Sequence, residues 1–157
     1  MVFMAGTLSR LFAFALTATA LVACDGADGT PIGPEGGIVV SDDGRLTVEI
    51  PAGALDGTVD VSIHVVEDGP EGDESAIRAY AIEPMGTALV FPATVEYDWT
   101  VEPSADALSL ESTTLEDPTL VMERGALWRA LADHTVDMDA GYVAGSAHYF
   151  GTIAIVD

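Results

Sequence analysis

Apolar and polar residues alternate along much of the chain, a pattern typical of β-strands that bury one face and expose the other. Two alternating stretches, residues 45–50 and 59–66, flank the motif Ile50-Pro51-Ala52-Gly53-Ala54-Leu55. Pro51 has no backbone donor, and Gly53 tolerates backbone angles that other residues avoid. We therefore expect a corner between two strands at this motif.

Further alternating stretches predict an all-β fold, an antiparallel β-sandwich, because short strands bury too little surface on their own. Residues 84–95 are interrupted by Pro and Gly, which indicates a turn, a short strand and the start of an edge strand. Residues 105–111 instead indicate a short helical turn capped by Ser104. The other strands are expected at residues 37–41, 77–82, 93–99, 120–122, 127–131, 141–145 and 152–156.

The turn Asp42-Asp43-Gly44 allows two registers for the first hairpin. A two-residue Asp43-Gly44 turn places Val39 opposite Val48. A three-residue loop that ends in a left-handed Gly44 instead places Val40 opposite Leu46 and Ile38 opposite Val48. The second register aligns more apolar residues on one face and is preferred. The paired aspartates lack the ligand spacing of a calcium loop, so a turn is the better interpretation.

The first 23 residues have the features of a secretory signal, with one charge at Arg10 followed by about a dozen apolar and small residues. The stretch Leu21-Val22-Ala23-Cys24 resembles a bacterial lipobox, in which a peptidase cuts before the cysteine. The resemblance implies cleavage between Ala23 and Cys24, a diacylglycerol on the Cys24 thiol and acylation, for example with palmitate, of the new amino group. Cys24 is the only cysteine of the chain, so lipidation would account for an otherwise solitary thiol.

The chain that would remain, Cys24 to Asp157, has 134 residues, with four arginines against 26 acidic residues and a formal charge of −22. An excess of this size disfavours nucleic acid and anionic head groups as partners. Residues 24–36 are rich in Gly, Pro and Asp and are expected to form a flexible tether between the lipid and the fold.

A set of residues in the central part of the chain has the order and spacing of one domain family: Gly36-Gly37, Asp43-Gly44-Arg45-Leu46, the corner motif, Tyr80, Ile82, Pro84, Gly86 and Pro92. In these residues the chain resembles a ZU5-like domain, a β-sandwich of ankyrins, netrin receptors, tight-junction scaffolds and bacterial envelope proteins. The similarity covers residues 37–100 as a matched core, within a sandwich at 37–157 that residues 119–157 complete. Leu89 stands where the family often has Phe. The resemblance implies a protein-interaction or structural module without catalytic activity.

An acidic stretch after residue 66 offers oxygen ligands for a cation. Its five candidates are Glu67, Asp68, Glu71, Asp73 and Glu74. Gly and Pro between them indicate an exposed loop, and mobile carboxylates bind calcium loosely. A calcium-binding or glycan-binding surface module is therefore an alternative function for this acidic chain.

Other chemistry finds little support in the sequence. Some ZU5-type proteins cleave their own chain at a His-Phe-Ser motif, but the corresponding stretch here is His148-Tyr149-Phe150-Gly151, without a hydroxyl or thiol at the nucleophile position. His148 is expected to pack or to form a hydrogen bond beside the last strand. The three histidines have no zinc-ligand spacing, and no phosphate loop or dinucleotide motif occurs. We therefore predict no enzyme, no metal and no cofactor.

The combined prediction is a β-sandwich held by a lipid on Cys24 at a membrane of the bacterial cell envelope. Whether that is the inner or the outer membrane is left open by the sequence. The domain is expected to act as an interaction or structural module whose envelope partner the sequence does not identify.

Overall fold

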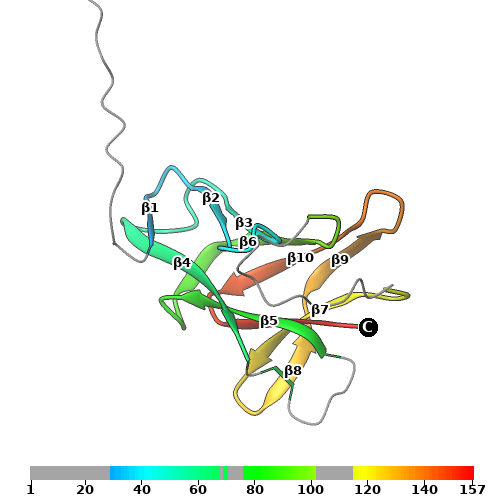
Figure 1. Cartoon of the computed structure of the whole chain (residues 1–157). Coiled ribbons are helices and arrows are strands. Elements are labelled where there is room, and N and C mark those ends of the chain that lie inside the picture. Colours follow the sequence, from blue (N-terminus) through cyan, green and yellow to red (C-terminus); the bar gives the residue numbers. More distant parts are fainter. Residues whose placement is uncertain (1–28, 68, 71–75, 102–114) are drawn as a thin grey trace, which may run out of the picture.

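The computed structural model describes residues 29–67, 69–70, 76–101 and 115–157. Every regular element in these segments is a strand, and the strands form two antiparallel sheets packed face to face (Figure 1). The predicted all-β sandwich is confirmed. None of these residues belongs to a helix with the length and hydropathy needed to cross a bilayer.

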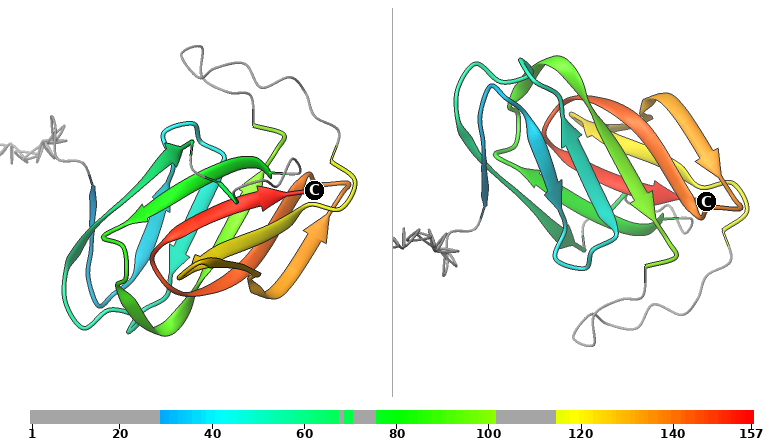
Figure 2. Two further views of the ribbon diagram at one scale, coloured as in Figure 1. Left: turned by 90° about the horizontal axis from the view of Figure 1, so that it is seen from below. Right: turned by 90° about the horizontal axis from the view of Figure 1, so that it is seen from above.

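One sheet has six strands and the other five. The six-stranded sheet runs in the order β1 (Thr30–Ile32), β4 (Val59–Val66), β5 (Ala76–Glu83), β11 (Thr152–Val156), β7 (Thr119–Arg124) and β8 (Leu127–Ala130). The five-stranded sheet runs in the order β2 (Gly37–Val40), β3 (Leu46–Ile50), β6 (Ala88–Asp98), β10 (Tyr142–Tyr149) and β9 (Ala132–Asp137). The first two strands lie at one side of the sandwich and β8 and β9 at the other, as both views in Figure 2 show.

The core fills the space between the sheets with alternate residues from both inner faces. Its largest fully buried side chains are Tyr80, Tyr97 and Phe150. The rings of Tyr80 and Tyr97 come from opposite sheets, with centroids 6.2 Å apart and planes tilted by 55°. This tilted geometry is one that aromatic pairs prefer.

The predicted corner is confirmed and connects the two sheets. It leads from β3 of one sheet to β4 of the other, and both Ala54 and Leu55 are buried in the core. Gly53 has a φ of 79°, and its amide donates a hydrogen bond to the carbonyl of Pro34 at 2.7 Å. The carbonyl of Ala54 accepts a hydrogen bond from Val90 in β6 at 3.0 Å. The corner thus joins three segments that are distant in the sequence.

The preferred register of the first hairpin is wrong. Val39 lies opposite Val48, and the amide of Ser41 donates to the carbonyl of Leu46 at 2.8 Å. Val39 is therefore buried, whereas Ile38 and Val40 are 59% and 50% exposed. The preferred register aligned the larger number of apolar residues on one face of the hairpin, and this criterion selected the wrong face of β2. The inner face of β2 continues into two polar residues, Ser41 and Asp43, which are also buried. Gly44 does adopt the expected left-handed conformation, with a φ of 75°.

The prediction of a tether over residues 24–36 is wrong from Thr30 onward. Strand β1 pairs with β4, with Ile32 opposite Val59, and Ile32 is 4% exposed. Ile32 is the single large apolar residue of this Gly- and Pro-rich stretch, and its burial draws the segment into the fold.

Two other strand predictions also need correction. The residues from Ala88 to Asp98 form one continuous strand that passes through Pro92, instead of a short strand followed by a second one. Strand β9 was missed, because most of its residues are exposed and show no alternation. The hairpin at Gly125 is confirmed by the pairing of β7 with β8. The helical turn expected at 105–111 lies outside the described residues.

The register of β2 can be tested with two isosteric substitutions. Val39→Thr places a hydroxyl in the core and should lower the free energy of unfolding by about 1–3 kcal/mol. Val40→Thr places the same group on the exposed face and should change it by less than about 0.5 kcal/mol. Urea unfolding of both variants measures the difference. An equal or larger loss for Val40→Thr would contradict the register.

Candidate functional site

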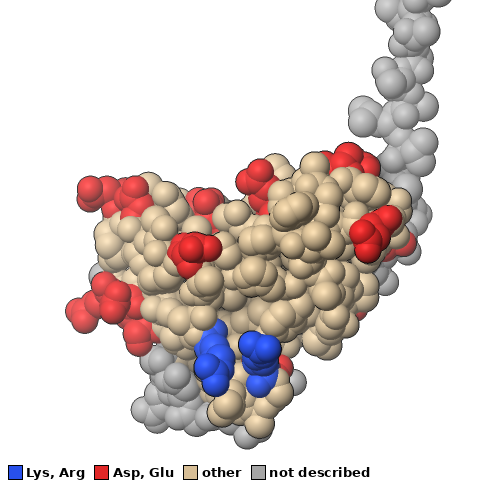
Figure 3. All heavy atoms as spheres, turned by 180° about the vertical axis from the view of Figure 1, so that it is seen from behind, with Lys and Arg blue, Asp and Glu red and all other residues tan. Residues whose placement is uncertain are grey.

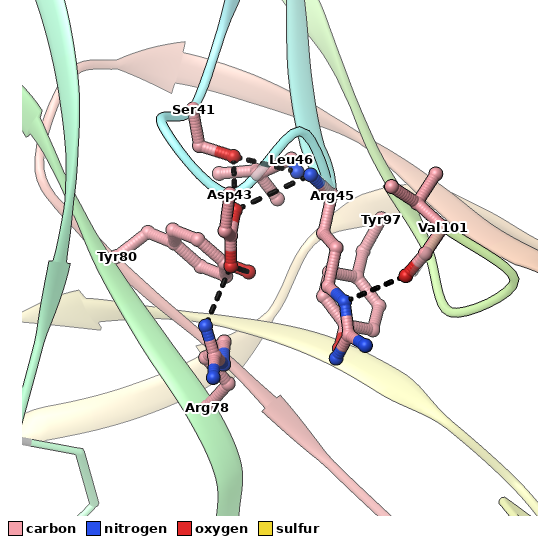
Figure 4. A network of polar contacts seen from close by, with 8 residues as sticks. All are labelled: Ser41, Asp43, Arg45, Leu46, Arg78, Tyr80, Tyr97 and Val101. Atoms are coloured by element: carbon pink, nitrogen blue, oxygen red, sulfur yellow. Dashed lines mark hydrogen bonds and ion pairs between the residues drawn. The ribbon is translucent and has the colours of Figure 1, made fainter. Parts of the chain in front are cut away.

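A buried polar network is centred on Asp43, in the turn between β2 and β3 (Figure 4). Its Oδ1 accepts hydrogen bonds from the Ser41 hydroxyl at 2.6 Å and from the Arg45 amide at 3.2 Å. Its Oδ2 accepts from the Arg78 guanidinium at 2.6 Å and from the Tyr80 hydroxyl at 2.8 Å. Both carboxylate oxygens therefore have two donors each.

The network joins the two sheets. Asp43 follows β2 of the five-stranded sheet, whereas Arg78 and Tyr80 lie on β5 of the six-stranded sheet. The side chains of Asp43 and Arg78 are only 4% and 7% exposed, so the pair is a buried salt bridge. Water cannot replace a lost partner at such a site, and the two charges depend on each other.

The surroundings of Asp43 also determine its protonation. Burial alone would raise its pKa, but the hydrogen bonds from Ser41, Tyr80 and the Arg45 amide and the charge of Arg78 hold the pKa below its ordinary value of 3.8. Burial raises the pKa of Tyr80, and the neighbouring Asp43 carboxylate raises it further. Asp43 is therefore ionised and Tyr80 neutral at physiological pH.

A second arginine extends the network without a carboxylate partner among the described residues. The Nε of Arg45 donates to the carbonyl of Val101 at 3.0 Å, and its Nη1 lies 3.5 Å from the Tyr97 hydroxyl. These contacts hold the chain where it leaves β6. The Nε of Arg78 is buried and has no hydrogen-bond partner among the described residues. Because both carboxylate oxygens of Asp43 are paired with donors, and these donors come from both sheets, we interpret this network as a clamp between the sheets.

Ser62, His64 and Asp42 have the order of groups found in serine hydrolases. His64 Nε2 lies 3.0 Å from the Ser62 hydroxyl, and its Nδ1 lies 3.9 Å from Asp42 Oδ2. The second distance is too long for a hydrogen bond, and the Asp42 side chain is 88% exposed. An acid that is fully hydrated and out of reach does not orient the imidazole. Ser62 itself is 8% exposed, so this arrangement does not form a hydrolase site.

An open cleft of about 380 Å³ lies where the chain crosses from β8 to β9, at the side of the sandwich away from β1. The hairpin of β7 and β8 forms one wall, and the end of β10 forms the other. The residues that line it are Met122, Arg124, Arg129, Ala130, Leu131, Ala132, Ser146, Ala147, His148 and Tyr149.

Strand pairing places both arginines of the hairpin on one face. Arg129 lies opposite Met122, and Arg124 follows Met122 by two residues, so all three side chains share a face. Met122 is buried, whereas Arg124 and Arg129 are exposed. The two positive charges of the hairpin therefore lie in solvent next to the edge of the hydrophobic core. Two arginine side chains lie next to each other on the surface in Figure 3, and most acidic side chains of this view lie elsewhere.

Irregularities in β10 shape the opposite wall. The pairing of β10 with β6 shifts between Ala147 and Tyr149, and this bulge allows consecutive residues to line the same cleft. Gly145 provides room for Leu131, since a Cβ there would lie 2.7 Å from the Cβ of Leu131. The Tyr149 hydroxyl donates to the carbonyl of Glu123 at 2.9 Å and thereby ties β10 to the hairpin. The cleft is thus held open by defined contacts.

The candidates from the sequence have different outcomes. Ala23, Cys24, Asp68, Glu71, Asp73 and Glu74 lie outside the described residues. Glu67 is exposed just after β4. The described segments bring no three His, Cys, Asp or Glu side chains together as a possible metal site.

His148 and Phe150 have different surroundings. His148 lines the cleft, whereas Phe150 lies in the core. Phe150 is 1% exposed, and its amide donates to the carbonyl of Thr87 at 2.9 Å, so it is a packing residue of the turn between β10 and β11. His148 is exposed and lines the cleft, and no hydrogen bond joins its side chain to another described residue, so the expectation that it packs or forms a hydrogen bond beside the last strand is wrong. Its exposure follows the alternation of β10, in which Val143, Gly145 and Ala147 face inward and are buried.

The sequence contained signals for both sites. Arg78 stands at an inward position of an apolar strand, which requires a buried acidic partner. Arg124 and Arg129 flank a glycine turn, and they are two of only five arginines in the chain.

No protein-family model matches the chain, and no curated protein is significantly similar to it. The ZU5-like resemblance therefore stays a prediction.

Removing the charge of Asp43 should destabilise the fold strongly. Asp43→Asn keeps the shape but leaves the buried Arg78 guanidinium without a counter-charge, so the free energy of unfolding should fall by about 3 kcal/mol or more. Asp42→Asn makes the same change of net charge at the neighbouring exposed residue and is the matched control, with an expected change below about 0.5 kcal/mol. Equal losses in urea unfolding would show that the network is not a clamp.

The difference between wild type and Asp43→Asn should also depend on pH. The pKa of Asp43 is lowered by folding, so its contribution is complete above its unfolded value and is lost as pH falls through the folded value. The stability gap should therefore be constant from pH 7 to about pH 5 and shrink below about pH 4. Protonation of the many exposed acids affects both proteins alike and cancels in the gap. A gap that persists unchanged at pH 2.5 would contradict the lowered pKa.

Proposed function

We propose that the chain is a lipid-anchored protein of the bacterial cell envelope whose β-sandwich binds a partner and does not catalyse a reaction. The lipobox-like stretch before Cys24 supports the anchor. The observation that carries the binding role is the contrast between the two polar sites. The Asp43 carboxylate is buried and paired with Arg78 inside the fold, whereas the cleft opens to solvent with two arginines that have no carboxylate partner among the described residues.

The position of the anchor relative to the cleft agrees with this role. Strand β1 begins at Thr30, only six residues after Cys24, and a chain of that length spans at most about 20 Å whatever its conformation. A lipid on Cys24 therefore keeps the β1 side of the sandwich close to the bilayer. The strands β8 and β9 lie at the opposite side (Figure 2), and the cleft is lined by residues of β8 and the start of β9. A molecule that approaches from the aqueous side can reach it.

The anchor is tested by comparing Cys24→Ala with Thr19→Ala, a control substitution inside the leader. In a bacterium that processes lipoproteins, wild type and Thr19→Ala should fractionate with the membrane and start at an acylated Cys24 in mass spectrometry. Cys24→Ala should lack the acyl mass and be released from the membrane or keep its leader. A wild-type protein that is extracted by water with its leader attached would exclude the anchor.

The binding role is tested with a photo-crosslinker placed at two exposed positions. Ala132 lines the cleft, whereas Thr94 lies on the outer face of the five-stranded sheet. In intact cells, the crosslinker at Ala132 should give a defined adduct that the crosslinker at Thr94 does not give. Recovery of only free monomer from both positions would argue against a binding module at this cleft.

A further inference from the structure

Two of the four arginines in the described segments are used inside the fold, and the other two lie at the cleft. Arg78 is paired with Asp43, and Arg45 holds the carbonyl of Val101. Arg124 and Arg129 have no carboxylate within ion-pair distance among the described residues, and no carboxylate side chain lines the cleft. In a chain with a net charge of −21, such a pair is an unusual local concentration of positive charge.

The back of the cleft is apolar. Met122, Leu131 and Ala147 line it and are 4%, 8% and 2% exposed, so they present the edge of the hydrophobic core. A ligand that fits both parts carries an anionic head for the guanidinium groups and an apolar body for the back wall. A volume of about 380 Å³ lies at the small end of ligand pockets and suits a body of on the order of ten non-hydrogen atoms.

The charge of the whole chain selects among anions. Its negative field repels anions at long range, and the repulsion increases with the ligand's charge. Polyanions such as nucleic acid are therefore disfavoured, and a monoanion is favoured over a dianion. The planar guanidinium group matches the two oxygens of a carboxylate in a bidentate geometry, which is strong enough to act at short range.

The geometry points to a specific ligand class: we propose that the cleft binds small organic carboxylates with an apolar body. The head lies between Arg124 and Arg129, and the body packs against Met122, Leu131 and Ala147. His148 at the rim can donate a further hydrogen bond through a ring nitrogen. The link between Tyr149 and the Glu123 carbonyl fixes the hairpin before binding, so little ordering is needed when a ligand enters.

This inference names the ligand of the binding site proposed above, but it does not depend on the lipid anchor. Its test uses the full mature protein purified in detergent, with hexanoate as the probe. Hexanamide has the same body without the charge, and inorganic phosphate has the charge without the body. Isothermal titration calorimetry measures affinity, and amide chemical shifts of Ala147 and His148 report where the probe binds.

Hexanoate should bind saturably and shift both amides, with an affinity about tenfold or more above that of hexanamide, because the head contributes charge-assisted hydrogen bonds. The double variant Arg124→Gln and Arg129→Gln should lower the affinity for hexanoate about tenfold or more. Thr58→Glu with Thr94→Glu makes the same change of net charge at exposed positions outside the cleft, and it should keep the affinity within about twofold. The single variant Arg129→Gln, which changes one exposed side chain, checks the result if the double variant does not fold.

Three results would overturn the proposal. They are the absence of saturable hexanoate binding at millimolar concentrations, equal losses in the arginine and threonine variants, and phosphate binding tighter than hexanoate binding. If hexanoate fails while the crosslinker at Ala132 still captures a partner, the ligand class is wrong and the binding module stands. If neither is observed, both proposals fail at this cleft.

Discussion

The buried salt bridge between Asp43 and Arg78 is the constraint on which the sandwich depends. A buried ion pair adds little net stability compared with an apolar pair, because both charges lose their hydration, but it strongly penalises arrangements that separate the charges. Asp43 belongs to one sheet and Arg78 to the other, so the pair fixes how the sheets lie against each other. It also explains why β2 turns Val39 inward and leaves Ile38 and Val40 on the surface.

The same interaction marks the limit of what the pattern of apolar residues can predict. Alternation located most of the strands, and the chemistry of proline and glycine located the corner at residues 50–55, because these features are local. The register of β2 depends on a partner 35 residues away, so a count of apolar residues in the hairpin selected the wrong face. Strand β1 was missed because a three-residue strand is too short for a periodic pattern, and β9 because its exposed residues do not alternate.

The sequence contained single residues of the cleft but not their arrangement, for a different reason. Each part of the cleft is unremarkable alone: two arginines at a hairpin, a histidine near a strand end and a glycine in β10. The pairing of Met122 with Arg129 brings the arginines to one face, and the pairing of β10 with β6 and β9 places the end of β10 on the opposite wall. Both depend on strand pairing between distant segments, which the sequence pattern does not determine.

The distribution of the arginines connects stability with function in this acidic protein. A high negative charge favours solubility, but it destabilises the compact state and repels anionic ligands at long range. Arg78 neutralises one of these negative charges at a buried position, where its guanidinium group joins the two sheets. Arg124 and Arg129 lie at the far side from β1, where the chain leaves positive charge in contact with solvent. The chain has few cations, and two of them lie together on the wall of a half-apolar cleft, which supports the proposal that this cleft recognises an anion.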